Sequence, residues 1–132
     1  MRVDIQDLLH LRFEDGQGDP LTGAIDCLGA VACVFRKLGW GTDKLDPAGL
    51  DGDARAIADT AWDFMGDSVA SATEVGDLIL SYPVRRRPHV SVVIDSRLGL
   101  AFSSHQGHGA MTVPLGQIQQ VRGVYRLREE FR

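Results

Sequence analysis

The sequence predicts a single α+β domain, residues 1–132, in which one buried helix packs on an antiparallel sheet of about five strands. Three observations support this fold class. Helical patterns come first along the chain and strand patterns second, as in domains that segregate the two kinds of element. The segment 25–38 is apolar on nearly every face, which is typical of a central buried helix. With 132 residues, 44% of them apolar, the chain can bury one core without disulfides.

The first predicted element is a short helix over residues 4–11, because Ile5, Leu8 and Leu9 recur at helical spacing. A glycine-rich loop with an Asp-Pro dipeptide follows it. The apolar helix over 25–38 comes next, with an acidic residue at its start, two basic residues in its last turn and a glycine after it, as capping and dipole preferences favour. Before the strands, the pattern predicts a loop over 41–52 and an amphipathic helix over 53–65.

The second half of the chain contains the predicted strands, which are runs of β-branched and other apolar residues bounded by turn residues. The first of these strands is expected to stop at Pro83, because proline cannot donate to a sheet ladder. The predicted strands are 77–82, 89–95, 98–104, 111–115 and 121–127.

The charges are divided unevenly between the two halves, within a net charge of −4. Residues 1–78 carry 15 acidic and 6 basic side chains, and the remaining residues carry 3 and 8. This division is interpreted as an acidic helical layer beside a basic sheet. An acidic chain whose basic cluster is confined to 85–87 does not indicate nucleic-acid binding. Two cysteines are too few for a disulfide scaffold or a four-cysteine zinc site, and we expect no metal and no cofactor.

The sequence predicts neither a membrane span nor a signal peptide. No apolar run reaches the roughly 18 residues that a membrane helix needs. Asp4 and Asp7 do not fit the basic and then apolar start of a signal peptide. We therefore expect synthesis in the cytoplasm.

Cys27 is the residue best placed for chemistry. It lies in the first turn of the apolar helix, just after Asp26, where free backbone N–H groups and the positive end of the helix dipole favour a thiolate. Cys33 lies six residues further on and is interpreted as a small core residue. A thiolate nucleophile needs a base, usually a histidine. His89 opens a later strand and is the candidate base.

This ordered set resembles the NlpC family of bacterial cell-wall cysteine peptidases, which have a reduced papain-like fold. The resemblance extends over residues 5–128. The chain is similar in particular to stand-alone peptidases encoded in phage tail clusters. The matching segments are residues 9–18 together with Gly-Ala-Ile-Asp-Cys-Leu-Gly at 23–29, Val-Gly-Asp-Leu-Ile-Leu at 75–80, His-Val-Ser-Val-Val-Ile at 89–94 and Gly-Val-Tyr-Arg at 123–126.

The resemblance implies that Cys27 attacks an amide carbonyl of a peptidoglycan stem peptide and that His89 accepts its proton. In the family, a third residue on the following strand, typically histidine, orients the imidazole. Here Ser103 stands at the aligned position and is the favoured orienting residue. His105 is the alternative, because it lies on the same strand face.

Three residues are expected to contact substrate, and two of them depart from the family pattern. Phe13 stands where many members have tyrosine near the oxyanion region. Leu28 replaces the serine that helps to bind the amine of the stem peptide, beside Asp26.

These departures leave two main hypotheses. The first is a peptidase or amidase that acts at the cell wall as part of a virion or phage-like particle. The second is a catalytically weak or inactive NlpC-like assembly or binding module, with the proteins of a phage tail tip or baseplate as partners. A papain-like acyltransferase is a third, because the same acyl-enzyme serves any acceptor amine.

Overall fold

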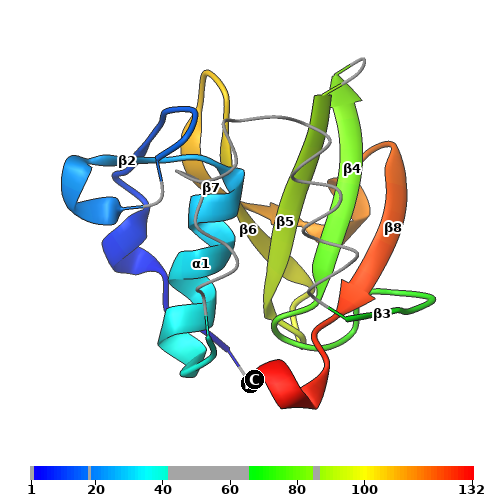
Figure 1. Ribbon diagram of the computed structural model, residues 1–132. Coiled ribbons are helices and arrows are strands. Elements are labelled where there is room, and N and C mark those ends of the chain that lie inside the picture. Colours follow the sequence, from blue (N-terminus) through cyan, green and yellow to red (C-terminus); the bar gives the residue numbers. More distant parts are fainter. Residues whose placement is uncertain (1, 18, 42–65, 85–86) are drawn as a thin grey trace.

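The computed structural model describes residues 2–17, 19–41, 66–84 and 87–132. Within these ranges one α-helix, α1 (Cys27–Leu38), packs beside an antiparallel sheet of six strands (Figure 1), so the fold is α+β as predicted. The strands lie in the order β3-β8-β4-β5-β6-β7. Their bounds are Asp67–Ser68 (β3), Leu78–Val84 (β4), Arg87–Asp95 (β5), Leu100–His105 (β6), Gly109–Pro114 (β7) and Val121–Arg126 (β8). No helix in the described ranges is long and apolar enough to cross a membrane.

The residues before α1 form a strap along one edge of the sheet. Strands β1 (Arg12–Phe13) and β2 (Ala24–Ile25) pair in parallel, and a 3-10 helix, η2 (Pro20–Thr22), lies between them in the chain. The helix predicted over 4–11 is one 3-10 turn, η1 (Gln6–Leu8). The reason is the spacing of the buried residues, since Ile5, Leu8 and Leu11 follow the three-residue repeat of a 3-10 turn, whereas Leu9 is exposed.

Helix α1 begins and ends where its capping residues place it. The Asp26 carboxylate accepts the N–H of Gly29 at 2.7 Å, which satisfies one of the free N–H groups of the first turn. Gly39 ends the helix in the left-handed conformation. The helix starts at Cys27, two residues later than predicted, because Ala24–Ile25 belong to β2. Residues 27–35 are all buried, which confirms that this helix is the centre of the core.

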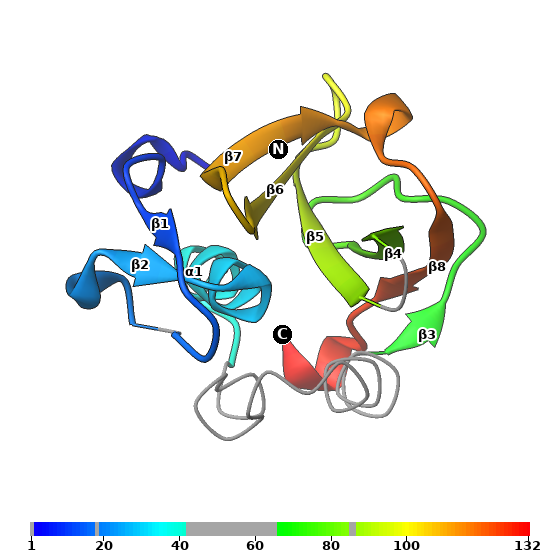
Figure 2. The same cartoon turned by 90° about the horizontal axis from the view of Figure 1, so that it is seen from above.

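The two faces of the sheet bury different apolar clusters. Val92 and Phe102 belong to the larger cluster, which includes the residues of α1. Val93 and Ala101 point to the opposite face, where Ile118 packs against them. Figure 2 shows that the strands follow a curved path, with the 3-10 helix η5 (Leu115–Gln117) beyond them on the side away from α1. The sheet therefore has a helix-covered face and a second face that is only partly covered.

The strands agree with the sequence predictions except at their ends. Strand β4 continues through Pro83, so the prediction that it stops there is wrong. A register shift between Ser81 and Val84 explains the continuation, because a bulge removes the need for a ladder hydrogen bond at the proline. The two-residue strand β3 was not predicted. The loop predicted over 41–52, apart from Gly41, and the helix predicted over 53–65 lie outside the described residues.

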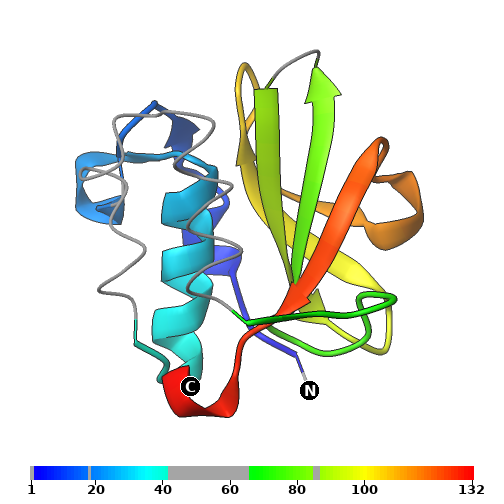
Figure 3. The same cartoon turned by 45° about the vertical axis from the view of Figure 1, so that its right-hand side comes forward.

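A buried ion pair ties β8 to the turn before β4. The Asp77 carboxylate is 1% exposed and accepts the backbone N–H groups of Thr73 and Glu74, both at 3.0 Å. The Arg126 guanidinium donates two further hydrogen bonds to it, at 2.9 and 3.0 Å. In Figure 3 the starts of α1 and β5 lie at the same end of the molecule, opposite the end of β8, whose last residue is Arg126. The pair therefore anchors the sheet away from the candidate site.

Candidate active site

Cys27 is held at the start of α1 by contacts on both sides. Asp26, directly before it, caps the helix through Gly29. The carbonyl of Ile25 accepts the Ser104 hydroxyl of β6 at 2.7 Å. Cys27 is itself only 6% exposed. The helix start is thus fastened to the strand that follows β5.

Strands β5 and β6 are not paired along their whole length, and the unpaired part lies next to Cys27. The paired positions of these strands end at Val92 and Phe102. Beyond them, the carbonyl of Val90 accepts the Ser103 hydroxyl at 2.8 Å. The N–H of Val90 points to the Cys27 sulfur, where it favours the thiolate. The sulfur therefore lies beside the first residues of β5, where the two strands separate.

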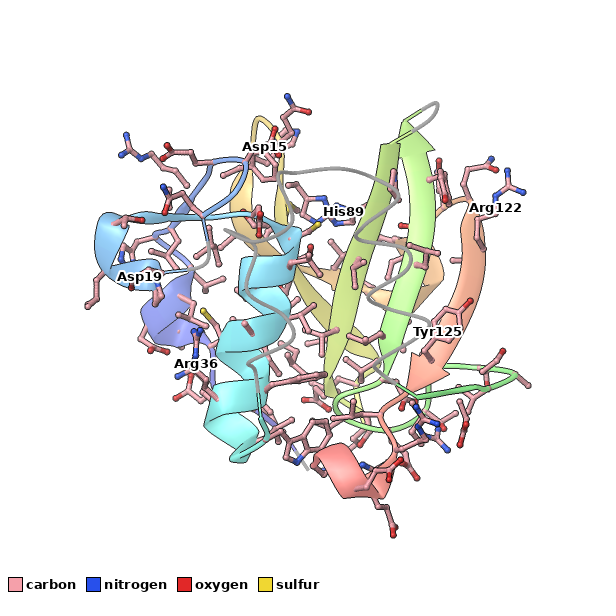
Figure 4. All side chains as sticks on the ribbon, viewed as in Figure 1. Asp15, Asp19, Arg36, His89, Arg122 and Tyr125 are labelled. Carbon is pink, nitrogen blue, oxygen red and sulfur yellow. The ribbon has the colours of Figure 1, made fainter. Side chains whose placement is uncertain are left out.

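His89 of β5 and His105 of β6 stack on one another in this same region. Their ring centroids are 4.3 Å apart and their planes are tilted by 34°. In the view of Figure 4 the labelled His89 side chain lies level with the start of α1. The Nε2 atoms of both rings are buried, and neither has a hydrogen-bond partner among the described residues. Buried polar atoms are rarely left in this way, so the pair is a candidate for binding or proton transfer.

Burial keeps the thiol and both imidazoles uncharged at neutral pH. It raises the pKa of Cys27 to about 11, outweighing the N–H of Val90. Burial, and secondarily the neighbouring His105, lowers the pKa of His89 to about 3. Burial also lowers the pKa of His105, with a smaller effect from His108. The expectation of a thiolate at the helix start is therefore wrong for this structure, because desolvation exceeds the stabilisation by the helix terminus.

Ser103 and His105, the two candidates for orienting the imidazole, occupy different positions. The Ser103 hydroxyl is fully buried and donates to the carbonyl of Val90. His105 lies against the His89 ring. The structure thus brings His105, the alternative candidate, to the imidazole of His89. The Ser103 hydroxyl instead bonds to the backbone carbonyl of Val90, the residue after His89. The orienting role of Ser103 stays a prediction that substitution can test.

The residues expected to contact substrate differ in how far they reach the surface. The two carboxylate oxygens of Asp26 accept the N–H groups of Gly29 and Gly16, and burial raises the pKa of this carboxyl. Leu28 is 2% exposed and belongs to the main core. Phe13 on β1 is partly exposed. Asp26 therefore shapes the helix start, and Phe13 is the one of the three with accessible surface.

Several polar residues near the imidazoles were not predicted. Ser81 and Ser91 line a pocket together with His89 and His105. Ser91 could have been found, because it lies two positions after His89 on the same strand. The pocket residues Gln117 and Gln119 lie in and after η5, where no periodic signal exists. In the described parts of the chain, no three His, Cys, Asp or Glu side chains are grouped so as to hold a metal ion.

No family model matches the sequence, and no curated protein matches it. Solved structures do resemble the fold. NlpC2 from Trichomonas vaginalis matches with a TM-score of 0.61 at 15% identity, and NlpC1 from the same organism matches with a TM-score of 0.63 at 14% identity. Each match covers 93% of this chain, but the chain spans only 43% and 41% of those proteins. The chain therefore has an NlpC-like fold.

Proposed function

We propose that the protein is a cysteine peptidase or amidase that hydrolyses peptide bonds in the stem peptides of peptidoglycan. One observation carries the proposal: the Cys27 sulfur lies at the backbone N–H of Val90, the residue that follows His89 on β5, and the His89 ring stacks on His105. A thiol, a base and a second imidazole are the groups that nucleophilic acyl transfer requires. The likeness to NlpC structures supports the fold on which such a site is built.

The proposed reaction proceeds in two acyl transfers. As the Cys27 sulfur attacks the carbonyl carbon, its proton passes to His89. The backbone N–H of Cys27 donates to the oxyanion that forms. When the C–N bond breaks, His89 returns the proton to the leaving amine, and the acyl group stays on sulfur as a thioester. His89 then deprotonates a water molecule that attacks the thioester and releases the acid and the free thiol.

The charge states of the resting site determine when the proton moves. With the pKa of Cys27 near 11 and that of His89 near 3, the thiolate–imidazolium pair is a minor state before substrate binds. Proton transfer is therefore coupled to attack on the carbonyl instead of preceding it. His105 affects this step, because an imidazolium at His89 would form next to its ring.

The biological setting is part of the proposal and rests on the sequence resemblance. Similarity to peptidases of phage tail clusters supports a component of a phage tail or a phage-derived particle. Such a particle would carry the protein to the cell wall and would supply tail-tip or baseplate proteins as neighbours. The stem peptide would then be the substrate encountered during entry.

An assembly or binding module is the second candidate, and one observation favours it. A buried neutral thiol beside a neutral imidazole is also what an inactive relative would contain. Leu28, turned into the core, leaves no hydroxyl at the position where the family binds the stem-peptide amine. In this case the fold would be retained for contacts with a particle.

The first prediction separates these functions. Purified peptidoglycan incubated with the wild-type protein should release new amino groups, and the Cys27→Ala variant should release none above the blank. Cys33→Ala is the matched control, because Cys33 is a second buried cysteine of α1 that lies away from the site. It should retain most of the activity. Wild-type protein that equals Cys27→Ala on every wall type would contradict the peptidase and support the module.

The second prediction concerns the orienting residue. His105→Ala should lower kcat by about a hundredfold or more, because an orienting group acts in the proton-transfer step. Ser103→Ala should have the smaller effect on kcat and should instead reduce stability, since its hydroxyl completes the opened ladder at Val90. The reverse order, with Ser103→Ala inactive and His105→Ala near wild type, would restore Ser103 as the orienting residue.

A further inference from the structure

A pocket of about 210 Å³ opens next to the two stacked imidazoles, on the face of the sheet away from α1. His89 and His105 form part of its wall, and the buried Ser81 and Ser91 lie beside them. The volume equals the share of about seven water molecules in the liquid, which suits one side chain of moderate size.

Strand alternation separates this pocket from the sulfur. Val90 points to the core shared with α1, and Val93 points to the opposite cluster. His89 and Ser91 alternate with Val90, so they belong to the Val93 face. The Cys27 sulfur lies at the backbone of Val90. The pocket and the His89 imidazole therefore lie on the face of β5 away from α1, and the sulfur lies at the backbone of the same strand.

This position gives the pocket a place in the proposed reaction. His89 must deliver its proton to the leaving amine while the carbonyl carbon is still bonded to Cys27. The leaving amine must consequently reach the imidazole, and the residue that carries this amine extends beyond it. The pocket is the cavity that begins at the imidazole on that side.

We propose that this pocket binds the side chain on the leaving-amine side of the scissile bond and selects an uncharged side chain that forms hydrogen bonds. The inference rests on the proposed peptidase function and adds its leaving-group specificity. The side chains that line the pocket determine which ligand side chain it selects. Two serines and two glutamines, Gln117 and Gln119, supply groups that both donate and accept, and Val113 and Ile118 supply apolar surface.

The residues that line the pocket do not favour a charged side chain of the ligand. None of the described residues that line the pocket is Asp, Glu, Lys or Arg. Burial lowers the pKa of both histidines, so neither is a cation at pH 7. An ionised carboxylate or ammonium would lose hydration here without gaining an opposite charge, whereas a carboxamide would keep its hydrogen bonds.

Binding to the Cys27→Ala variant tests the pocket without catalysis. The probes are glutamine amide, glutamate amide and lysine amide, which resemble a leaving group with a neutral, negative or positive side chain. Imidazole NMR shifts report binding, with the exposed His10 as the internal control. At pH 7, glutamine amide should shift His89 and His105 and should bind at least about tenfold more tightly than the two charged amides. Equal binding of the three, or a shift confined to His10, would overturn the proposal.

A charge placed in the wall should change the preference in a predictable direction. Gln119→Lys, in the Cys27→Ala background, should tighten glutamate amide by about threefold to fivefold, as expected for an exposed ion pair. Gln6→Lys adds the same charge on η1, which does not line the pocket, and should change nothing. An equal effect of the two lysines would show long-range attraction and would overturn the assignment of Gln119 to the subsite.

Peptide cleavage distinguishes failure of this inference from failure of the peptidase. Three peptides that differ only in Gln, Glu or Lys after the scissile bond are compared with the wild-type protein. Cleavage of all three at equal kcat/KM would overturn the inference and leave the peptidase standing. Selective binding to Cys27→Ala without cleavage of any peptide would retain the pocket and overturn the enzyme.

Discussion

His89 is a base whose Nε2 atom is buried next to a second imidazole, and this environment links its protonation to folding. Its pKa is about 3 in the folded protein, against an ordinary value of 6.5. Below pH 6.5 the unfolded chain takes up a proton that the folded chain does not accept until about pH 3. The contribution of His89 to stability is therefore complete above about pH 6.5 and is lost as the pH falls toward 3. His105, whose pKa is also lowered, acts in the same direction.

A substitution at His89 should make this linkage visible. Between pH 6 and pH 4 the free energy of unfolding should fall for the wild type by up to about 1.4 kcal/mol per pH unit for this one proton. His89→Gln removes that contribution, so its stability should fall less steeply in urea titrations over this range. His10→Gln, at an exposed histidine, should parallel the wild type. A slope for His89→Gln equal to that of the wild type would show that the buried imidazole is not held neutral.

At the scale of elements, the Asp77–Arg126 pair joins the turn before β4 to β8. Asp77 is 1% exposed and accepts two backbone and two guanidinium hydrogen bonds, and Glu74 contacts the same Arg126 at 3.1 Å. Removal of the Asp77 carboxylate would break this pair and would leave the backbone N–H groups of Thr73 and Glu74 without their acceptor. The pair Lys37–Asp7 offers a contrast, because the Asp7 side chain is 65% exposed.

We therefore expect very different effects from two similar substitutions. Asp77→Ala should lower the free energy of unfolding by about 3 kcal/mol. Asp7→Ala, the matched control, should lower it by less than about 1 kcal/mol. Urea unfolding monitored by tryptophan fluorescence measures both. Comparable losses in the two variants would show that burial does not determine the strength of the Asp77 pair.

Much of the element order could be predicted from sequence because its signals are local. The apolar run of α1 and the apolar residues of β4 and β5 specify elements without reference to the rest of the chain. The 3-10 turn η1 could not be distinguished from a helix, because Ile5 and Leu8 fit both repeats. Strand β3 has only two residues and no pattern of its own. The partner of Asp77 is 49 residues away, and nothing in the spacing indicates it.

At the scale of the whole molecule, the strap before α1 connects the helix start to the far edge of the sheet. The Leu11 carbonyl accepts the N–H of Ala110 at 2.9 Å, so β1 continues from a contact with β7. Gly109 permits this approach, because a Cβ atom there would lie 2.6 Å from the Leu11 carbonyl oxygen. Its φ of +76° also disfavours other residues.

Two glycine substitutions in the same hairpin separate backbone strain from close approach. Gly107→Ala adds a methyl group at φ +85° with nothing within 4 Å, and it should lower stability by about 1–2 kcal/mol. Gly109→Ala should lower it further, because the strap must also move from β7. Thermal unfolding of both variants measures the difference. Equal losses of stability in the two variants would mean that the strap can move away from β7 at no cost in free energy.

The residues of the candidate site could be predicted from sequence, but their arrangement could not. Helix capping and strand order nominated Cys27 and His89, and the family resemblance added Ser103, with His105 on the same strand face as its alternative. They could not decide between the last two, because that choice depends on where the ladder between β5 and β6 opens. The opening is a property of two strands and a helix start together. The pocket residue Gln119 likewise depends on how the segment after η5 crosses the sheet.

The proposed peptidase requires Cys27 to be the nucleophile, and a trapped acyl-enzyme tests this directly. Wild-type protein is mixed with peptidoglycan fragments, quenched with acid during turnover and digested for mass spectrometry. We predict an acyl adduct on the peptide that contains Cys27, its absence from Cys27→Ala and its persistence in Cys33→Ala. Cleavage of the fragments without an adduct on Cys27, or with the adduct on Cys33, would show that Cys27 is not the nucleophile.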